Sequence, residues 1–142
     1  MPGVELSTSA CNGHVVVALR GDLDITGAAD AGAAMAALVV PDRCLIIDMS
    51  ALDFIDCGAL DALLRVQWLA WTTGGDVVLA APQRHVLQLL ALTGRDHAFL
   101  IHASVQAAVA GLPGRGARYG GRPLAVSTAR SGRAAPSRTG TR

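Results

Sequence analysis

The residues with the most evident chemistry lie in a short turn, Asp56-Cys57-Gly58, which follows the apolar run that begins at Leu45. Leucines with helical spacing come directly after the turn, so it is expected to stand at a helix N-terminus. Such an end presents unpaired backbone N–H groups and a partial positive charge, which together hold a phosphate or a carboxylate favourably. The turn is therefore the first candidate for a binding or regulatory site.

The thiol of Cys57 permits two interpretations. At a helix N-terminus a thiol can have a lowered pKa and act as a redox sensor. The neighbouring carboxylate of Asp56 opposes this, because a like charge disfavours the thiolate. The second interpretation, which we favour, is that cysteine serves as a small residue in a tight turn. The two hypotheses differ in the expected alkylation rate of Cys57 at neutral pH.

Patterns that support catalysis or cofactor binding are absent from the sequence. The four histidines fall on different predicted elements, and no nucleophile, histidine and acid form a recognisable catalytic set. The sequence has no Gly-Lys-Ser/Thr phosphate loop and no Cys/His cluster with zinc-ligand spacing. We therefore expect a binding module that is not an enzyme and that holds neither a cofactor nor a metal.

The predicted helix that follows the turn has a second candidate surface. Asp61, Arg65 and Thr72 fall on one side of a helical wheel, with Trp68 at the border. Asp61 and Arg65 have the i, i+4 spacing of a weak ion pair. Trp68 is either a docking anchor, since aromatic residues at a charged rim often dominate binding energy, or a side chain folded partly onto the core.

These residues must be positioned by alternating strands and helices. Asn12-Gly13 predicts a hairpin turn, and Thr26 is the predicted N-cap of the first helix. The expected strands span residues 4–10, 14–20, 44–49, 76–80 and 98–102. The expected helices span residues 26–40, 57–72, about 82–94 and 104–112. The order is β-β-α-β-α-β-α-β-α, which predicts an α/β fold with a largely parallel sheet after an N-terminal hairpin and helices packed on it.

Charge divides the chain into two parts. Residues 1–111 carry five arginines against all eleven acids, whereas residues 112–142 carry seven arginines and no acid. The Gly/Pro/Ser/Thr/Arg composition beyond Pro113 predicts a disordered basic tail. We favour a solvated extension; the alternative is an arginine arm for nucleic acid, an anionic surface or the acidic body of another copy. With Tyr119 as its one aromatic residue, the tail does not predict a specific nucleic-acid site.

The cellular compartment is suggested by what the chain lacks. No charged N-terminal segment precedes an apolar run, and no apolar run approaches the length of a membrane span. Three widely spaced cysteines fit reduced thiols better than a disulfide framework. These features predict a cytoplasmic protein that does not bind membranes.

Three motifs and the element order resemble a known family over residues 4–111. Gly21-Asp22-Leu23-Asp24 stands in the place of Gly-Glu-Leu-Asp, and Asp56-Cys57-Gly58-Ala59-Leu60 in the place of Asp-Ser-Ser-Gly-Leu. Leu92-Thr93-Gly94 matches the Leu-Thr-Gly that often ends the third helix of that family. The sequence thus resembles a STAS domain, the fold of the bacterial anti-anti-sigma factors, also called anti-sigma factor antagonists. The implied domains are residues 1–111, the STAS domain, and residues 112–142, the tail.

The resemblance implies a function and a switch. Family members bind an anti-sigma factor of the GHKL serine-kinase type and so regulate sigma-factor-dependent transcription. The partner phosphorylates the second serine of the turn, which prevents binding. Aligned without a gap, that serine falls on Gly58, and residues 57–59 offer no hydroxyl, so we do not expect control by phosphorylation at this turn. The implied partner-binding residues are Asp24, Asp56, Cys57, Gly58, Asp61, Arg65 and Trp68.

A second hypothesis assumes the same fold but a different function. The protein would be a STAS scaffold, or a nucleotide-responsive sensor subunit, within a signalling assembly. Its partners would then be further copies of itself or other STAS proteins. The identity of captured partners separates the two hypotheses.

Overall fold

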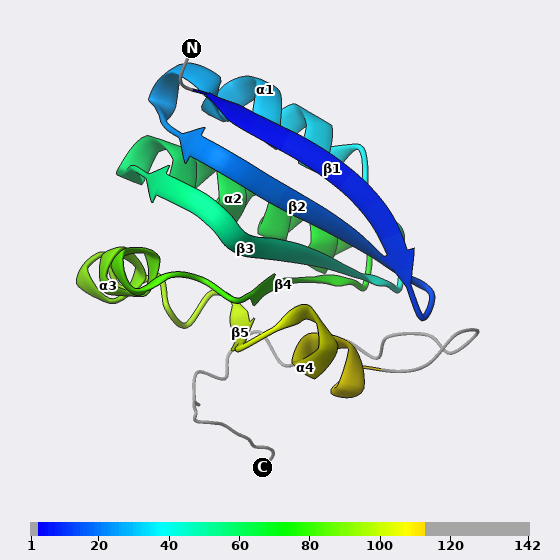
Figure 1. Cartoon of the computed structure of the whole chain (residues 1–142). Helices are drawn as coiled ribbons and strands as arrows, with labels where there is room; N and C mark the ends of the chain where they lie inside the picture. Colours follow the sequence, from blue (N-terminus) through cyan, green and yellow to red (C-terminus); the bar gives the residue numbers. More distant parts are fainter. Residues whose placement is uncertain (1–2, 113–142) are drawn as a thin grey trace.

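A computed structural model describes residues 3–112, which form a five-stranded sheet with helices on both faces (Figure 1). The strands are β1 (Val4–Cys11), β2 (His14–Leu23), β3 (Cys44–Ile55), β4 (Asp76–Ala80) and β5 (Leu100–His102). The helices are α1 (Ile25–Ala36), α2 (Cys57–Thr72), α3 (Arg84–Leu92) and α4 (Val105–Ala110). The strands lie in the order β1-β2-β3-β4-β5, with β1 antiparallel and the others parallel to their neighbours. The predicted α/β fold and element order are confirmed.

The hairpin between β1 and β2 turns where the sequence predicts. Cys11 pairs with His14, which leaves a two-residue loop. Both loop residues have positive φ, 54° at Asn12 and 89° at Gly13. Asparagine and glycine adopt this conformation readily, and the turn matches the twist of the flanking strands. The edge strand β1 is therefore held in a fixed register against β2.

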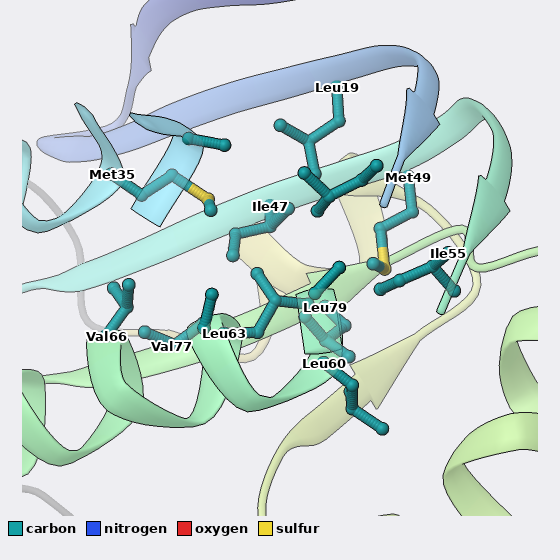
Figure 2. Close-up of a cluster of buried hydrophobic side chains, with 14 of the residues drawn as sticks. Leu19, Met35, Ile47, Met49, Ile55, Leu60, Leu63, Val66, Val77 and Leu79 are labelled. Carbon is teal, nitrogen blue, oxygen red and sulfur yellow. The ribbon is translucent and has the colours of Figure 1, made fainter. Parts of the chain in front are cut away.

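Two apolar layers cover the sheet because its inner strands are apolar on both faces. The larger layer lies between the sheet and α1 and α2, with Leu19, Ile47 and Leu79 from the strands facing Met35 and Leu63 from the helices (Figure 2). The smaller layer lies on the opposite face under α4. Its buried members are Val16, Cys44, Ile46, Val78, Ala80 and Ala108.

The first helix is shorter than predicted, since α1 ends at Ala36 and not near Val40. Two short i to i−3 hydrogen bonds, from Leu38 N to Met35 O and from Val39 N to Ala36 O, close its last turn. The residue before Pro41 is biased away from helical geometry, and Leu38 and Val39 pack against the main core. The other helices, β1, β4 and the start of β5 differ from the prediction by at most two residues.

The strands β2 and β3 are both longer than predicted. Pairing continues from Ala18 with Asp48 to Leu23 with Ile55, through two shifts in register. These shifts place two more residues in β3 than in the matching part of β2, as β-bulges do. The bulges break the alternation of buried and exposed residues, which made residues 50–55 look like a turn in the sequence.

The extended part of β3 reaches beyond β4. Pairing with β4 stops at Asp48, which lies opposite Ala80. Gln83, just before α3, then donates its side-chain amide to the carbonyl oxygens of Ser50 (3.2 Å) and Leu52 (2.9 Å). A side chain thus satisfies backbone groups that a strand would otherwise pair.

Some predictions fall outside this part of the chain. The basic tail lies beyond the described residues from position 113 onward. In residues 3–112, no helix has both the length and the apolar character that crossing a bilayer requires.

Candidate functional site

The helix α1 begins at an aspartate and not at the predicted Thr26. Asp24 has extended backbone geometry, and its carboxylate accepts hydrogen bonds from Thr26 N (3.0 Å) and Gly27 N (3.3 Å). The hydroxyl of Thr26 also donates to this carboxylate. The cap moves because β2 continues to Leu23, and Asp24 is then the first residue free to leave the strand and turn its side chain onto the helix end.

Asp56 caps α2 and also binds the start of α1. One carboxylate oxygen accepts from Ala59 N at 2.9 Å, and the other accepts from Ile25 N at 2.9 Å. Asp56 N in turn donates to Leu23 O at 3.3 Å. One side chain therefore fixes the first turns of both helices relative to each other, although the two positions are 31 residues apart.

The charge of Asp24 is stabilised by its local hydrogen bonds. The hydroxyl of Thr26 contributes most to a lowered pKa of the Asp24 carboxyl, and the backbone N–H groups of Thr26 and Gly27 lower it further. Partial desolvation acts in the opposite direction and is outweighed. Asp24 thus remains a carboxylate under ordinary conditions, with part of its hydrogen-bonding capacity used by α1.

The position implied for phosphoserine is covered by an apolar side chain. A Cβ built on Gly58 would lie 2.1 Å from Cδ1 and 3.1 Å from Cγ1 of Ile25. Ile25 is 65% exposed, so its side chain lies over Gly58 from the solvent side. Cys57 is the exposed first residue of α2. We name Asp24, Ile25, Asp56, Cys57 and Gly58 the helix-start surface.

The predicted pairing of Asp61 with Arg65 is wrong. Asp61 pairs instead with Arg95, from the loop after α3, with 2.7 Å between the carboxylate oxygen and the guanidinium nitrogen. Both side chains are partly exposed, so the pair adds little stability. Arg65 is exposed and forms no ion pair with any residue in the range 3–112. The longer-range partner brings the α3–β5 loop against α2.

Trp68 is exposed and held by a second tryptophan. It is 60% exposed, and its ring meets that of Trp71 edge to face, with centroids 5.5 Å apart. The indole N–H of Trp71 donates to the buried carboxylate of Asp76 at 3.2 Å. The hypothesis that Trp68 folds onto the core therefore loses support, and a docking role stays a prediction.

The seven predicted partner-binding residues fall into two groups. Asp24, Asp56, Cys57 and Gly58 meet at the helix-start surface. Asp61, Arg65 and Trp68 lie along α2, and ten residues of helix place Trp68 about 15 Å from Gly58. A partner that contacts both groups must follow α2 over nearly three turns.

Sequence reasoning missed Ile25, the most exposed apolar residue of the helix-start surface. Its spacing from Ala28 and Met35, which are buried, would have assigned it to the core-facing side of α1. It is exposed because the first turn of α1 lies at the end of the core layer. A better signal was its place directly after Asp24, because aspartate is a preferred helix N-cap.

Metal coordination has no support in the part of the chain that the structure describes. Residues 3–112 contain no group of three or more His, Cys, Asp or Glu side chains arranged to hold an ion. The helix-start surface presents one exposed apolar side chain beside two capping carboxylates.

Comparison with protein-family models identifies the family, because one model matches most of this fold. The model of the STAS domain matches residues 6–108. The chain therefore belongs to the STAS domain family. No curated protein sequence matches the chain.

Several solved structures are similar to this chain. An anti-sigma-factor antagonist (STAS) domain protein from Planctomyces limnophilus has a TM-score of 0.68 at 16% identity, covering 75% of this chain and 96% of that one. An anti-sigma factor antagonist from Mycobacterium paratuberculosis has a TM-score of 0.63 at 27% identity, covering 77% and 93%. The anti-sigma factor antagonist SpoIIAA, unphosphorylated, has a TM-score of 0.63 at 19% identity, covering 78% and 99%.

Proposed function

We propose that this protein is an anti-sigma factor antagonist. It binds an anti-sigma factor of the GHKL serine-kinase type in the bacterial cytoplasm and thereby regulates sigma-factor-dependent transcription. The similarity to several antagonists of this name supports the proposal. The observation that carries it is the helix-start surface. There the exposed apolar side chain of Ile25 stands beside the carboxylates of Asp24 and Asp56, and Asp56 holds its backbone N–H.

Ile25 is the centre of the proposed contact. Its backbone N–H is held by Asp56, so the side chain projects from a fixed point and loses little freedom when a partner covers it. Burial of an isoleucine side chain stabilises a complex by about 1.5–3 kcal/mol. The carboxylates of Asp24 and Asp56 attract a basic patch on the partner and set the orientation of encounter.

We propose that partner binding is not regulated by phosphorylation at position 58, where the family has a serine and this chain has Gly58. Residues 57–59 carry no hydroxyl, and Ile25 lies over the position where one would stand. Binding is therefore not interrupted by phosphorylation at this place. The protein occupies its partner constitutively or responds to another input.

The experiment compares three full-length baits in the native organism. The wild-type chain, Ile25→Asp and Val40→Asp are each used for affinity capture with quantitative mass spectrometry. Val40 is a matched control, because it is also exposed and apolar but precedes β3, at the opposite end of the sheet from the helix starts. A kinase-type anti-sigma factor should be enriched by the wild type and Val40→Asp, and depleted with Ile25→Asp.

The recovered partner is then titrated against the purified chains. Ile25→Asp should lower the affinity at least about tenfold, since that corresponds to about 1.4 kcal/mol. Val40→Asp should change it less than about twofold. Equal affinities of the two variants would remove the helix-start surface from the interface. Recovery of other STAS proteins without a kinase would favour a scaffold or sensor subunit instead.

A further inference from the structure

The face of the sheet opposite α1 and α2 is only partly covered. The helix α4 packs on Val16, Ile46 and Val78, near the hairpin end of the strands (Figure 1). Register and strand alternation place Ser9 beside Val16, and Ser7 and Asp48 on either side of Ala18, on this same face. Among residues 3–112, no helix packs on the part of this face that carries Ser7, Ala18 and Asp48 and continues toward the ends of β2 and β3. We name this part the open face.

The open face is acidic. Glu5 lies opposite Arg20, and Asp48 and Asp22 lie on the same face by alternation along β3 and β2. Arg20 is the single basic residue of this face among residues 3–112. Neither Glu5, Asp22 nor Asp48 forms an ion pair within that range. Three carboxylates against one guanidinium thus attract a basic segment.

An aromatic side chain adds to the open face. Phe54 pairs with Asp22 in the register and follows the same alternation, because its neighbour Ile55 enters the main core. Phe54 is 46% exposed. A ring beside carboxylates suits a guanidinium, which stacks on aromatic faces and binds carboxylates through two parallel hydrogen bonds.

The chain itself supplies a segment of opposite charge. Residues 113–142 carry seven arginines and no acid. This segment follows Leu112, which, like Cys11 next to the hairpin, packs against the small cluster under α4. The segment therefore begins on the same side of the sheet as the open face, at its hairpin end.

The length of the segment suffices to cross the open face. The twelve residues of β3 extend over about 40 Å. The eighteen steps from Leu112 to Arg130 span up to about 60 Å when extended. The arginines at positions 130, 133, 138 and 142 can therefore reach Asp22 and Phe54 at the far end.

We propose that residues 115–142 dock in cis on the open face, with arginines on Glu5, Asp22 and Asp48 and a guanidinium on Phe54. A tethered segment has an effective concentration on the order of millimolar, so a weak intrinsic affinity is enough for docking. Several ion pairs form together, and such a network stabilises docking more than an isolated surface ion pair does.

The proposed docking goes beyond the proposed function and does not depend on it. It uses a face turned away from α1 and α2, and therefore leaves the helix-start surface free for a partner. It also neutralises the acidic charge of the sheet, so that basic proteins are not drawn to this face. Its test needs no partner protein.

The test places a nitroxide on the full-length chain. The label is attached through Ser131→Cys in a Cys11→Ser, Cys57→Ser background, since Cys44 is buried and does not react. Paramagnetic broadening of backbone amides is measured by NMR in low salt. Amides of residues 5–9, 20–22, 48 and 54 should broaden most, and those of α1, on the opposite side of the sheet, should broaden less.

Salt and two charge variants provide the controls. The Debye length falls from about 10 Å at 0.1 M to about 3 Å at 1 M salt, so the broadening should disappear at 1 M. Asp22→Asn with Asp48→Asn should reduce it at least about threefold. The matched pair Asp30→Asn with Asp96→Asn, which removes the same charge elsewhere, should retain it.

Three outcomes would overturn the proposal. Broadening spread evenly over the protein, or centred on α1 and α2, would place the segment elsewhere. Broadening that survives Asp22→Asn with Asp48→Asn would exclude these carboxylates. In a mixture of labelled and isotope-enriched chains, broadening as strong as within one chain would show docking between copies. Loss of partner binding by Ile25→Asp is a separate result and bears on none of these.

Discussion

Polar groups are buried at one end of α2 and lie near solvent at the other. In its C-terminal half, Gln67 is fully buried and pairs with the fully buried Asp76 of β4 and with the backbone. The amide of Gln67 donates to Asp76 Oδ1 (2.8 Å) and Ala98 O (2.8 Å), and its oxygen accepts from Val77 N (2.7 Å). At the N-terminus of α2, the carboxylate of its cap Asp56 stays near solvent beside the exposed Ile25, as does that of Asp24, the cap of the neighbouring α1.

We infer that the difference separates stability from the proposed recognition. The buried network joins α2 to β4 and to the segment before β5, and because its groups are out of reach of solvent in the fold, each of them needs its partner there. The helix-start surface uses its carboxylates to fix two helix ends and leaves the apolar side chain between them without cover. We expect changes in the network to alter the free energy of unfolding, and changes at the helix-start surface to alter partner affinity.

The largest effect is expected from Gln67→Leu. This change keeps the volume but leaves the buried N–H of Val77 without its partner and removes the hydrogen bond from Gln67 to the buried carboxylate of Asp76, which costs about 2–4 kcal/mol of unfolding free energy. Urea denaturation followed by circular dichroism measures it. Gln106→Leu, on the exposed side of α4, is the matched control and should change stability by less than about 0.5 kcal/mol. Equal effects would show that the network carries no special stability.

A smaller loss is expected from Asp56→Ala. The substitution removes the cap of α2 and the hydrogen bond to Ile25 N together, and loss of a cap costs about 1–2 kcal/mol. Partner affinity should fall as well, because Ile25 is no longer held. Asp53→Ala, which removes a nearby exposed carboxylate that caps no helix, should leave stability unchanged. A stable Asp56→Ala variant with full partner affinity would refute the proposal that Asp56 positions Ile25 for binding.

The pair Gly58→Ser and Ile25→Ala sharpens the comparison further. Gly58→Ser forces the side chain of Ile25 to move, at about 1 kcal/mol, and this loss should be smaller in the Ile25→Ala background, where only the Cβ of residue 25 stays close to the added side chain. With the partner kinase and ATP, phosphate should be incorporated into Gly58→Ser, which retains Ile25, and not into the wild type at this position. Absence of phosphate in Gly58→Ser, with binding intact, would argue against docking of the kinase at this turn.

The smallest effect concerns pH. Because hydrogen bonds from Thr26 and Gly27 lower the pKa of Asp24, its stabilising contribution is complete above the ordinary aspartate pKa of about 3.9 and is lost as the pH falls through the lower folded value. As the pH falls below the ordinary aspartate pKa, the wild type should therefore lose more stability than Asp24→Asn. Urea midpoints at several pH values test this, and parallel curves would contradict it.

Much of the fold follows from local sequence. The continuous apolar residues of Leu45–Ile47 and the helical spacing of Leu60 and Leu63 predict the central strand and α2, because both patterns reflect burial. Asn12-Gly13 predicts the hairpin because few other residues adopt positive φ. Such signals depend only on neighbours along the chain.

What the sequence did not predict depends on distant contacts. The bulges in β3 are set by pairing with β2, and the partner of Asp61 lies 34 positions away at Arg95. The exposure of Ile25 depends on where the core layer ends, which its helical spacing does not encode. Gln67 looks like any polar residue on a helix until Asp76 and Ala98 are placed beside it.

The part of β3 beyond its last pair with β4 carries Leu52 and Ile55 and contains two more residues than the matching part of β2. Because the total offset is two positions, the inward direction of side chains is the same before and after the bulges, and Leu52 and Ile55 both enter the main core. The main core therefore continues past β4 to the residue just before Asp56, so the cap of α2 stands directly on buried structure.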